Sequence, residues 1–178
     1  MIDAKKIMLK YYDEDSDLFK LLWKHSNQVA DLSCEIAKRY QGEVDIEFVR
    51  EAALLHDIGI LETHAPSILC NGTKPYLQHG IIGGEMLRRE GLDRHALVCE
   101  RHTGAGLTKE EIIAQNLPLP HVDLLPVSVE EKIICYADNF FSKSNPDKEK
   151  TVDDVRRGMA RFGEVQLKRF EEMHNMFR

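Results

Sequence analysis

The sequence has few of the features that mark secreted or membrane-spanning proteins. Its four cysteines are widely spaced and form no Cys-x-x-Cys pair, which excludes a zinc knuckle and a thioredoxin-like redox motif. No apolar run approaches the roughly 20 residues that a membrane span needs, and the N-terminus lacks the apolar segment of a signal peptide. We therefore expect a cytoplasmic protein that has no membrane partner and whose cysteines are small core residues.

An excess of basic residues is missing as well. The 30 aspartates and glutamates outnumber the 24 lysines and arginines, and the resulting net charge of -6 excludes a dedicated binder of duplex nucleic acid. Neither an internal repeat nor a low-complexity stretch is present. A chain of 178 residues with this ordinary globular composition is expected to form one domain over residues 1–178.

Strand-like alternation of apolar and polar residues is a third absence, whereas helical periodicity runs through most of the chain. The sequence therefore predicts an all-α fold. Residues 60–75 contain two prolines and Asn71-Gly72, and are predicted to form a loop at the mouth of a pocket. The predicted helices cover about residues 16–40, 46–59, 77–90 and 93–102, then short helices opening after Thr108 and Ser128, and a last amphipathic helix over 152–177.

Polar side chains occupy the apolar faces of five predicted helices. Four helices each direct a histidine inward, and a fifth directs an aspartate the same way. A second aspartate follows one of these histidines in the run Leu55-His56-Asp57-Ile58-Gly59, where Gly59 is predicted to end the helix. The six residues are His25, His56, Asp57, His79, His102 and Asp138.

A metal site explains this set better than independent core residues do. One inward histidine is commonly a hydrogen-bonded core residue, but four imidazoles and two carboxylates cannot satisfy one another cheaply. One or two divalent cations would satisfy all of them, and nitrogen and oxygen ligands without thiolate favour iron, manganese, cobalt, nickel or zinc. Asp57, beside His56, is the natural bridge between two ions, which would activate a water for in-line attack at phosphorus.

The pattern resembles the HD-domain metal-dependent phosphohydrolases, in particular their His-Asp-Ile-Gly subgroup and a small uncharacterised bacterial and archaeal branch of it. The resemblance covers about residues 18–142, and its motifs are Leu54 to Gly59, Glu100 to Thr108, Glu130 to Ile133 and Ala137 to Asn139. It implies a bundle of about six to eight helices around a buried metal site. The last amphipathic helix, over about residues 151–177, is expected to close this domain.

The resemblance also implies a ligand set and an activity. His25, His56, Asp57 and Asp138 would hold the first metal, while Asp57, His79 and His102 would hold the second. The implied reaction is hydrolysis of a phosphomonoester or phosphoanhydride in a nucleotide or another small phosphorylated metabolite. The branch is similar to diiron dinucleoside-tetraphosphate hydrolases.

Related cyclic-dinucleotide phosphodiesterases carry a lysine just after the glycine that corresponds to Gly59, the last residue of the family signature Leu54 to Gly59, and they have a Gly-Tyr-Pro motif further on. This chain has Ile60 and no such tripeptide. The sequence therefore does not favour a cyclic-dinucleotide substrate.

Four further residues are predicted to line the pocket. Glu62 and His64 follow Leu54 to Gly59 closely, and either could act as a general acid for the leaving group or accept a hydrogen bond from the substrate. Arg101 precedes a ligand and Lys74 lies in the predicted loop, so both are candidate phosphate contacts. The sequence leaves the oligomeric state open.

Two other functions use the same ligands. Mixed-valent diiron HD oxygenases, of which inositol oxygenase is one, cleave carbon bonds with dioxygen, and substrate-dependent oxygen uptake would distinguish them. A non-catalytic, metal-stabilised interaction or sensing module is the third alternative, and it would lose its fold on metal removal without ever turning over a substrate.

Overall fold

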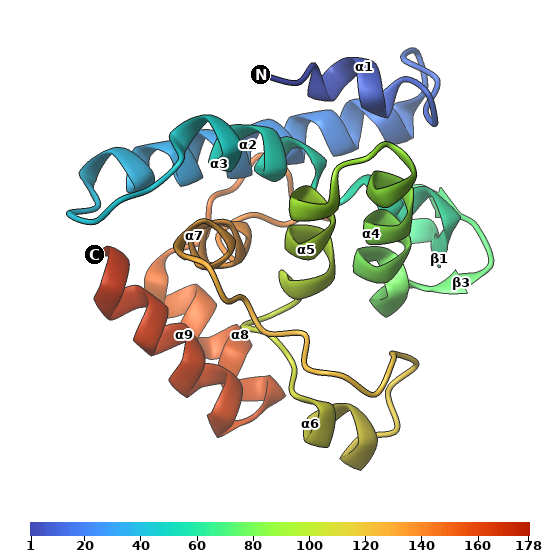
Figure 1. Ribbon diagram of the computed structural model, residues 1–178. Helices are drawn as coiled ribbons and strands as arrows, with labels where there is room; N and C mark the ends of the chain where they lie inside the picture. Colours follow the sequence, from blue (N-terminus) through green and yellow to red (C-terminus); the bar gives the residue numbers. More distant parts are fainter.

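Nine α-helices account for most of the chain in the computed structural model, which describes residues 1–178 (Figure 1). The predicted all-α fold is confirmed. The helices are α1 Ala4–Met8, α2 Asp17–Arg39, α3 Ile46–Leu55, α4 His79–Arg89, α5 Asp93–Arg101, α6 Lys109–Ala114, α7 Val129–Asp138, α8 Val152–Phe162 and α9 Glu164–Phe177.

Capping side chains fix where these helices begin. The Ser16 side chain accepts a hydrogen bond from the backbone N–H of Phe19 at the start of α2, and Asp45 caps α3 in the same way. Thr108 and Glu111 form the reciprocal capping box expected before α6. Each cap satisfies backbone donors that have no partner inside the helix, so these starts could be predicted from sequence.

The prediction of one helix over residues 152–177 is wrong. The chain breaks at Gly163, whose φ of 116° lies outside the helical region and separates α8 from α9. The apolar residues on both sides of the break keep a helical period, which hid the break in the sequence. The helical periodicity of the sequence also did not predict the short helix α1.

Residues 60–75 are more regular than the predicted loop. They hold a small sheet in the order β2-β1-β3, in which β1 Thr63–Ala65 pairs antiparallel with β2 Cys70–Asn71 and parallel with β3 Lys74–Pro75. Such short strands are too brief to show alternation. Three 3₁₀ helices flank them, η1 Ile58–Glu62, η2 Pro66–Ile68 and η3 Tyr76–Gln78.

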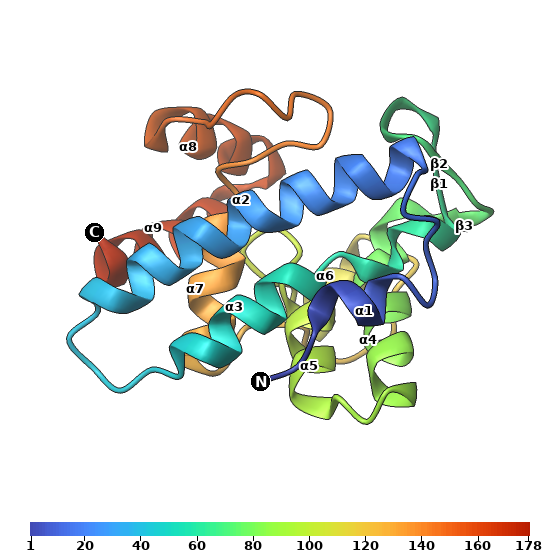
Figure 2. The ribbon, with the colours of Figure 1, turned by 90° about the horizontal axis from the view of Figure 1, so that it is seen from above.

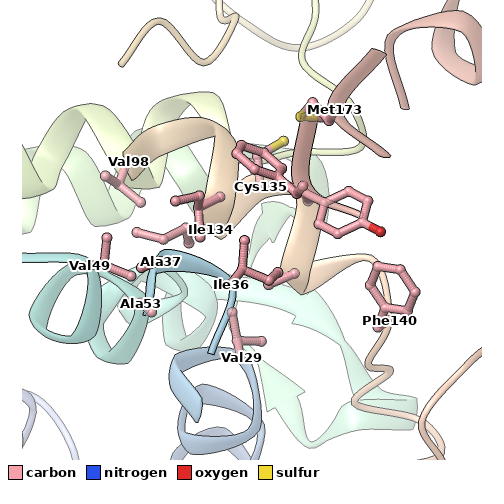
Figure 3. Packing of buried hydrophobic residues seen from close by; sticks show 14 of the residues in the cluster. Val29, Ile36, Ala37, Val49, Ala53, Val98, Ile134, Cys135, Phe140 and Met173 are labelled. Atoms are coloured by element: carbon pink, nitrogen blue, oxygen red, sulfur yellow. The ribbon is translucent and has the colours of Figure 1, made fainter. Parts of the chain in front are cut away.

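Two apolar clusters support the helices. One packs side chains of α2, α3, α5 and α7 against α8 and α9, with Ile134 and Cys135 of α7 near its middle (Figure 3). The other joins α1, η1 and α4 to the same α2, α3 and α5. Figure 2 shows α3 alongside α2, with the small sheet beyond one end of α2. All four cysteines are buried and unpaired. None of the helices combines the length and the apolar character that a membrane span requires.

Candidate metal centre

The predicted metal ligands lie mainly at helix ends. His25 is within α2, whereas His56 and His102 follow the last residues of α3 and α5. Asp138 is the last residue of α7 and His79 the first of α4, while Asp57 lies between α3 and η1. Three helices therefore direct their C-terminal ends, which carry partial negative charge, toward these residues. That field favours a cation.

Asp57 stands at the middle of the cluster and is completely buried. Its Oδ2 atom lies 3.1 Å from the Nε2 atoms of both His25 and His56. Its Oδ1 atom lies 3.2 Å from Nε2 of His79 and 3.3 Å from Nε2 of His102. The two carboxylate oxygens thus face two separate groups of imidazoles.

Asp138 completes the group around Oδ2. One of its oxygens lies 3.0 Å from Nε2 of His25 and 3.4 Å from Nε2 of His56. The ligand atoms of His25, His56, Asp57 and Asp138 all lie within 4.8 Å of one another, as do those of Asp57, His79 and His102. The structure therefore brings all six predicted ligands together, in two groups that share Asp57.

Backbone carbonyls fix the orientation of three of the four imidazoles. Nδ1 of His56 donates to the Ala53 carbonyl at 2.6 Å, and His79 and His102 make the same bond to the carbonyl three residues earlier, at 2.7 Å. A carbonyl cannot donate, so each Nδ1 carries a proton, and each ring can present an Nε2 lone pair to a cation when that ring is neutral. Nε2 of His79 and Nε2 of His102 then face each other at only 3.0 Å. A cation beside the two lone pairs relieves this contact.

Several buried atoms in the cluster lack a well-oriented hydrogen bond despite their short distances to one another. They are Nδ1 and Nε2 of His25, Nε2 of His56, and both carboxylate oxygens of Asp57. Leaving such atoms unsatisfied in a dry interior is costly. These donor types and their convergence fit one or two divalent transition-metal ions.

The protonation states suit ligation by the two carboxylates and by His102. Burial alone would raise the pKa of Asp57, but the charges of His56 and Lys143 outweigh it and hold that pKa well below its usual range. Burial would raise the pKa of Asp138 as well, but His25 and His56 hold it well below its usual range. Burial lowers the pKa of His102, so this ring stays neutral.

His56 responds to the same charges in the opposite sense. Its burial opposes protonation, but Asp57 and Asp138 raise its pKa to about 10. Without another cation, the cluster therefore recruits a proton to balance its buried carboxylates, and a metal ion would take the place of that proton.

A family model for the HD domain matches residues 22–142. The chain belongs to the HD-domain family. This match confirms the resemblance that the sequence shows to the superfamily of HD-domain metal-dependent phosphohydrolases, and the matched residues include the run from Leu54 to Gly59 that resembles its signature.

Relatives of this HD domain include an uncharacterized protein of Methanocaldococcus jannaschii, 42% identical over 136 residues that make up 74% of this chain and 71% of that protein. Two tRNA (cytidine(56)-2'-O)-methyltransferases are 35% identical over 138 residues in Thermoplasma volcanium and 42% identical over 99 residues in Picrophilus torridus. Those matches cover 76% and 55% of this chain but only 36% and 25% of the methyltransferases. The activity of the whole methyltransferases is therefore not assigned to this chain.

A solved HD domain shares the fold. The HD domain of the L. monocytogenes phosphodiesterase PgpH, in complex with cyclic-di-AMP, superposes with a TM-score of 0.51 and covers 91% of this chain and 96% of its own. The sequence identity is 17%, so the likeness concerns the fold alone.

Gly59 of the HD signature has a different role from the one predicted. Helix α3 ends at Leu55, four residues earlier, and Gly59 lies within η1. A Cβ atom at this position would lie 2.2 Å from the His79 carbonyl oxygen and 2.4 Å from the Gly83 nitrogen. The glycine is needed because η1 packs directly on the backbone of α4, and this packing holds His79 beside Asp57.

Replacement of Gly59 by alanine should therefore destabilise the HD domain by about 3 kcal/mol or more, because backbone atoms cannot move aside as a flexible side chain can. Denaturant unfolding measures the change. Gly158 in α8 is the matched control, since a Cβ there would meet nothing within 4 Å. Gly158→Ala should be neutral or stabilising by about 0.5–1 kcal/mol, through helix propensity. Equal stability of Gly59→Ala and wild type would contradict this account.

The other predicted pocket residues lie at the surface or in ion pairs. Glu62 at the end of η1 and His64 in β1 are exposed, and neither makes a hydrogen bond or ion pair with the six clustered residues. Lys74 in β3 is exposed as well. Arg101 is partly buried and donates to both carboxylate oxygens of Glu131, at 3.2 and 3.0 Å.

Lys143 is the residue near the cluster that the sequence did not reveal. It lies in the segment after α7, and its Nζ atom is 2.5 Å from Oδ2 of Asp57. Its charge balances the buried carboxylate, and Asp57 in turn raises the pKa of the lysine against the opposing effect of burial. An isolated lysine in a polar, proline-containing segment carries no periodic signal, so only the spacing of five residues after Asp138 could have pointed to it.

Proposed function

We propose that this HD domain is a metal-dependent phosphohydrolase that acts on a nucleotide or another small phosphorylated metabolite. The observation that carries the proposal is the position of Asp57, whose Oδ2 atom faces His25 and His56 while Oδ1 faces His79 and His102. One carboxylate directed at two sets of ligands suits a pair of ions, and such pairs catalyse in-line displacement at phosphorus.

The ligand assignment follows the two groups. His25, His56 and Asp138 would hold one ion together with Asp57, and His79 and His102 would hold the other with the same carboxylate. When bound, divalent ions of this kind lower the pKa of a coordinated water and supply a nucleophile near neutral pH.

The chain's own residues set up this chemistry. Carbonyl partners hold the rings of His56, His79 and His102 so that their Nε2 atoms converge. Asp57 and Asp138 remain ionised, because His56 and Lys143 lower the pKa of Asp57 and hydrogen bonding by His25 and His56 lowers that of Asp138. Protonation of the leaving group stays a prediction for Glu62 or His64, as do phosphate contacts for Lys74 and Arg101.

The proposal is tested by stripping the protein of metal, reloading it with manganese, cobalt or iron, and measuring phosphate release from nucleotides and phosphorylated sugars. We expect turnover that depends on metal and is lost in His56→Ala. Absence of turnover with every metal, or full activity in His56→Ala, would contradict the proposal. Substrate-dependent oxygen uptake by an iron-loaded protein that releases no phosphate would support the oxygenase instead.

A further inference from the structure

A cavity of about 340 Å³ opens beside the metal centre, and Lys143 is its only lysine or arginine. Asp138 reaches the cavity wall from the centre, so the cavity gives access to the ligands of the first group. The wall mixes hydroxyl groups with apolar side chains. Its other residues are Ala65, Ser67, Ile68, Tyr76, Phe141, Ser142 and Ser144.

Lys143 competes for an oxygen that the metal centre needs. Oδ2 of Asp57 lies 2.5 Å from Nζ of Lys143 and 3.1 Å from the Nε2 atoms of His25 and His56. A divalent ion held by those imidazoles would bind the same oxygen and take over much of its charge. The lysine side chain is only 10% exposed, so its ammonium group would then need another anion at the same place.

Tyr76 supports Lys143 from the side of the second ligand group. Its ring stacks on His79, with ring centroids 4.6 Å apart, and Nζ of Lys143 lies 5.9 Å from the centroid of the Tyr76 ring. That distance is within the range of a cation–π contact. The Tyr76 hydroxyl is a hydrogen-bond donor among the residues that line the cavity.

We propose that Lys143 binds the phosphate of the substrate in this cavity, and that the substrate is a compact phosphomonoester. The inference rests on the proposed function and names the substrate class for the same site. One buried cation matches one phosphoryl group. The paired hydroxyls of Ser142 and Ser144, 2.9 Å apart, suit a polar group of the ester, and Phe141 suits an apolar one. The cavity is at the small end of the roughly 300–1,000 Å³ of ligand pockets, which disfavours a bulky dinucleotide.

Calorimetric titration of the manganese-loaded protein with inorganic phosphate tests the role of Lys143 without relying on turnover. Lys143→Met, which keeps the apolar stem, should weaken phosphate binding by about 10- to 100-fold through loss of one charged hydrogen bond. Lys143→Arg should retain binding to within about tenfold, because it keeps the charge. Lys148→Met is the matched control in the same segment, where the lysine is exposed and makes no ion pair, and it should bind phosphate as the wild type does. Bound manganese should be equal in all four proteins.

Each outcome decides between the two proposals. If Lys143→Met binds phosphate as tightly as wild type while turnover persists, the inference about Lys143 is overturned and the proposed function stands. If metal-loaded wild type neither binds phosphate nor hydrolyses any ester, both are overturned. Should Lys143→Met not fold, Lys143→Gln carries the same test. A substrate panel decides the class: faster hydrolysis of phosphomonoesters than of dinucleotides is expected, and the reverse order overturns it.

Discussion

Asp57→Asn is expected to abolish metal binding at both positions and to lower kcat/KM by about 10³-fold or more, because activation of water depends on the bound ions. The expectation follows from geometry, since each oxygen of Asp57 faces a different pair of imidazoles. An amide offers one weak ligand oxygen and no charge. Metal content and phosphate release, measured on the same preparations, check both parts of the prediction.

Two other substitutions serve as references for Asp57→Asn. Asp138 approaches only the group of His25 and His56, so Asp138→Asn should lose one ion and keep the other. Asp147 is exposed and pairs with Lys24 at the surface, so Asp147→Asn should retain full metal content and activity. Wild-type metal content in Asp57→Asn would contradict the role of this carboxylate as a shared ligand.

Removal of metal should lower the melting temperature of the wild type by about 8–16 °C. A ligand present at about a thousand times its Kd stabilises the native state by about 4 kcal/mol, and 1 kcal/mol corresponds to about 2–4 °C in a chain of this size. The physical source is the set of buried imidazole and carboxylate atoms that lack oriented partners. Differential scanning calorimetry with and without a chelator measures the shift.

The lower melting temperature supports the account only if the chelator acts by removing metal from the cluster. Asp57→Asn should therefore melt at the same temperature with and without chelator. Equal melting temperatures of metal-loaded and chelated wild type would show that the cluster satisfies itself without a cation, and would contradict the account.

The helices with strong caps could be predicted from sequence, and the irregular parts could not. Ser16, Asp45 and Thr108 each place an acceptor three residues before a free backbone N–H, which is a local signal. No comparable local signal marks the break at Gly163, because an unbroken helix would fit the spacing of the apolar residues equally well. The three short strands between Thr63 and Pro75 depend on pairing with one another, which periodicity cannot detect.

The six clustered residues could be predicted because five of them are polar residues on apolar helix faces and Asp57 directly follows one of the five, and such exceptions are informative together. Lys143 gave no such signal, since it lies outside the helices and reaches Asp57 only through the tertiary fold. Gly59 was assigned the wrong role for a related reason. A glycine is required at this position because its backbone contacts His79 and Gly83 in α4, and the residues around Gly59 in the sequence do not reveal that contact.

Counting the metal ions bound per chain tests the central claim most directly. The purified protein is reloaded with manganese or cobalt, excess metal is removed, and the bound metal is measured by elemental analysis against protein concentration. The arrangement of His25, His56 and Asp138 on one side of Asp57, and of His79 and His102 on the other, predicts two ions per chain. A single ion per chain, or none, would contradict it.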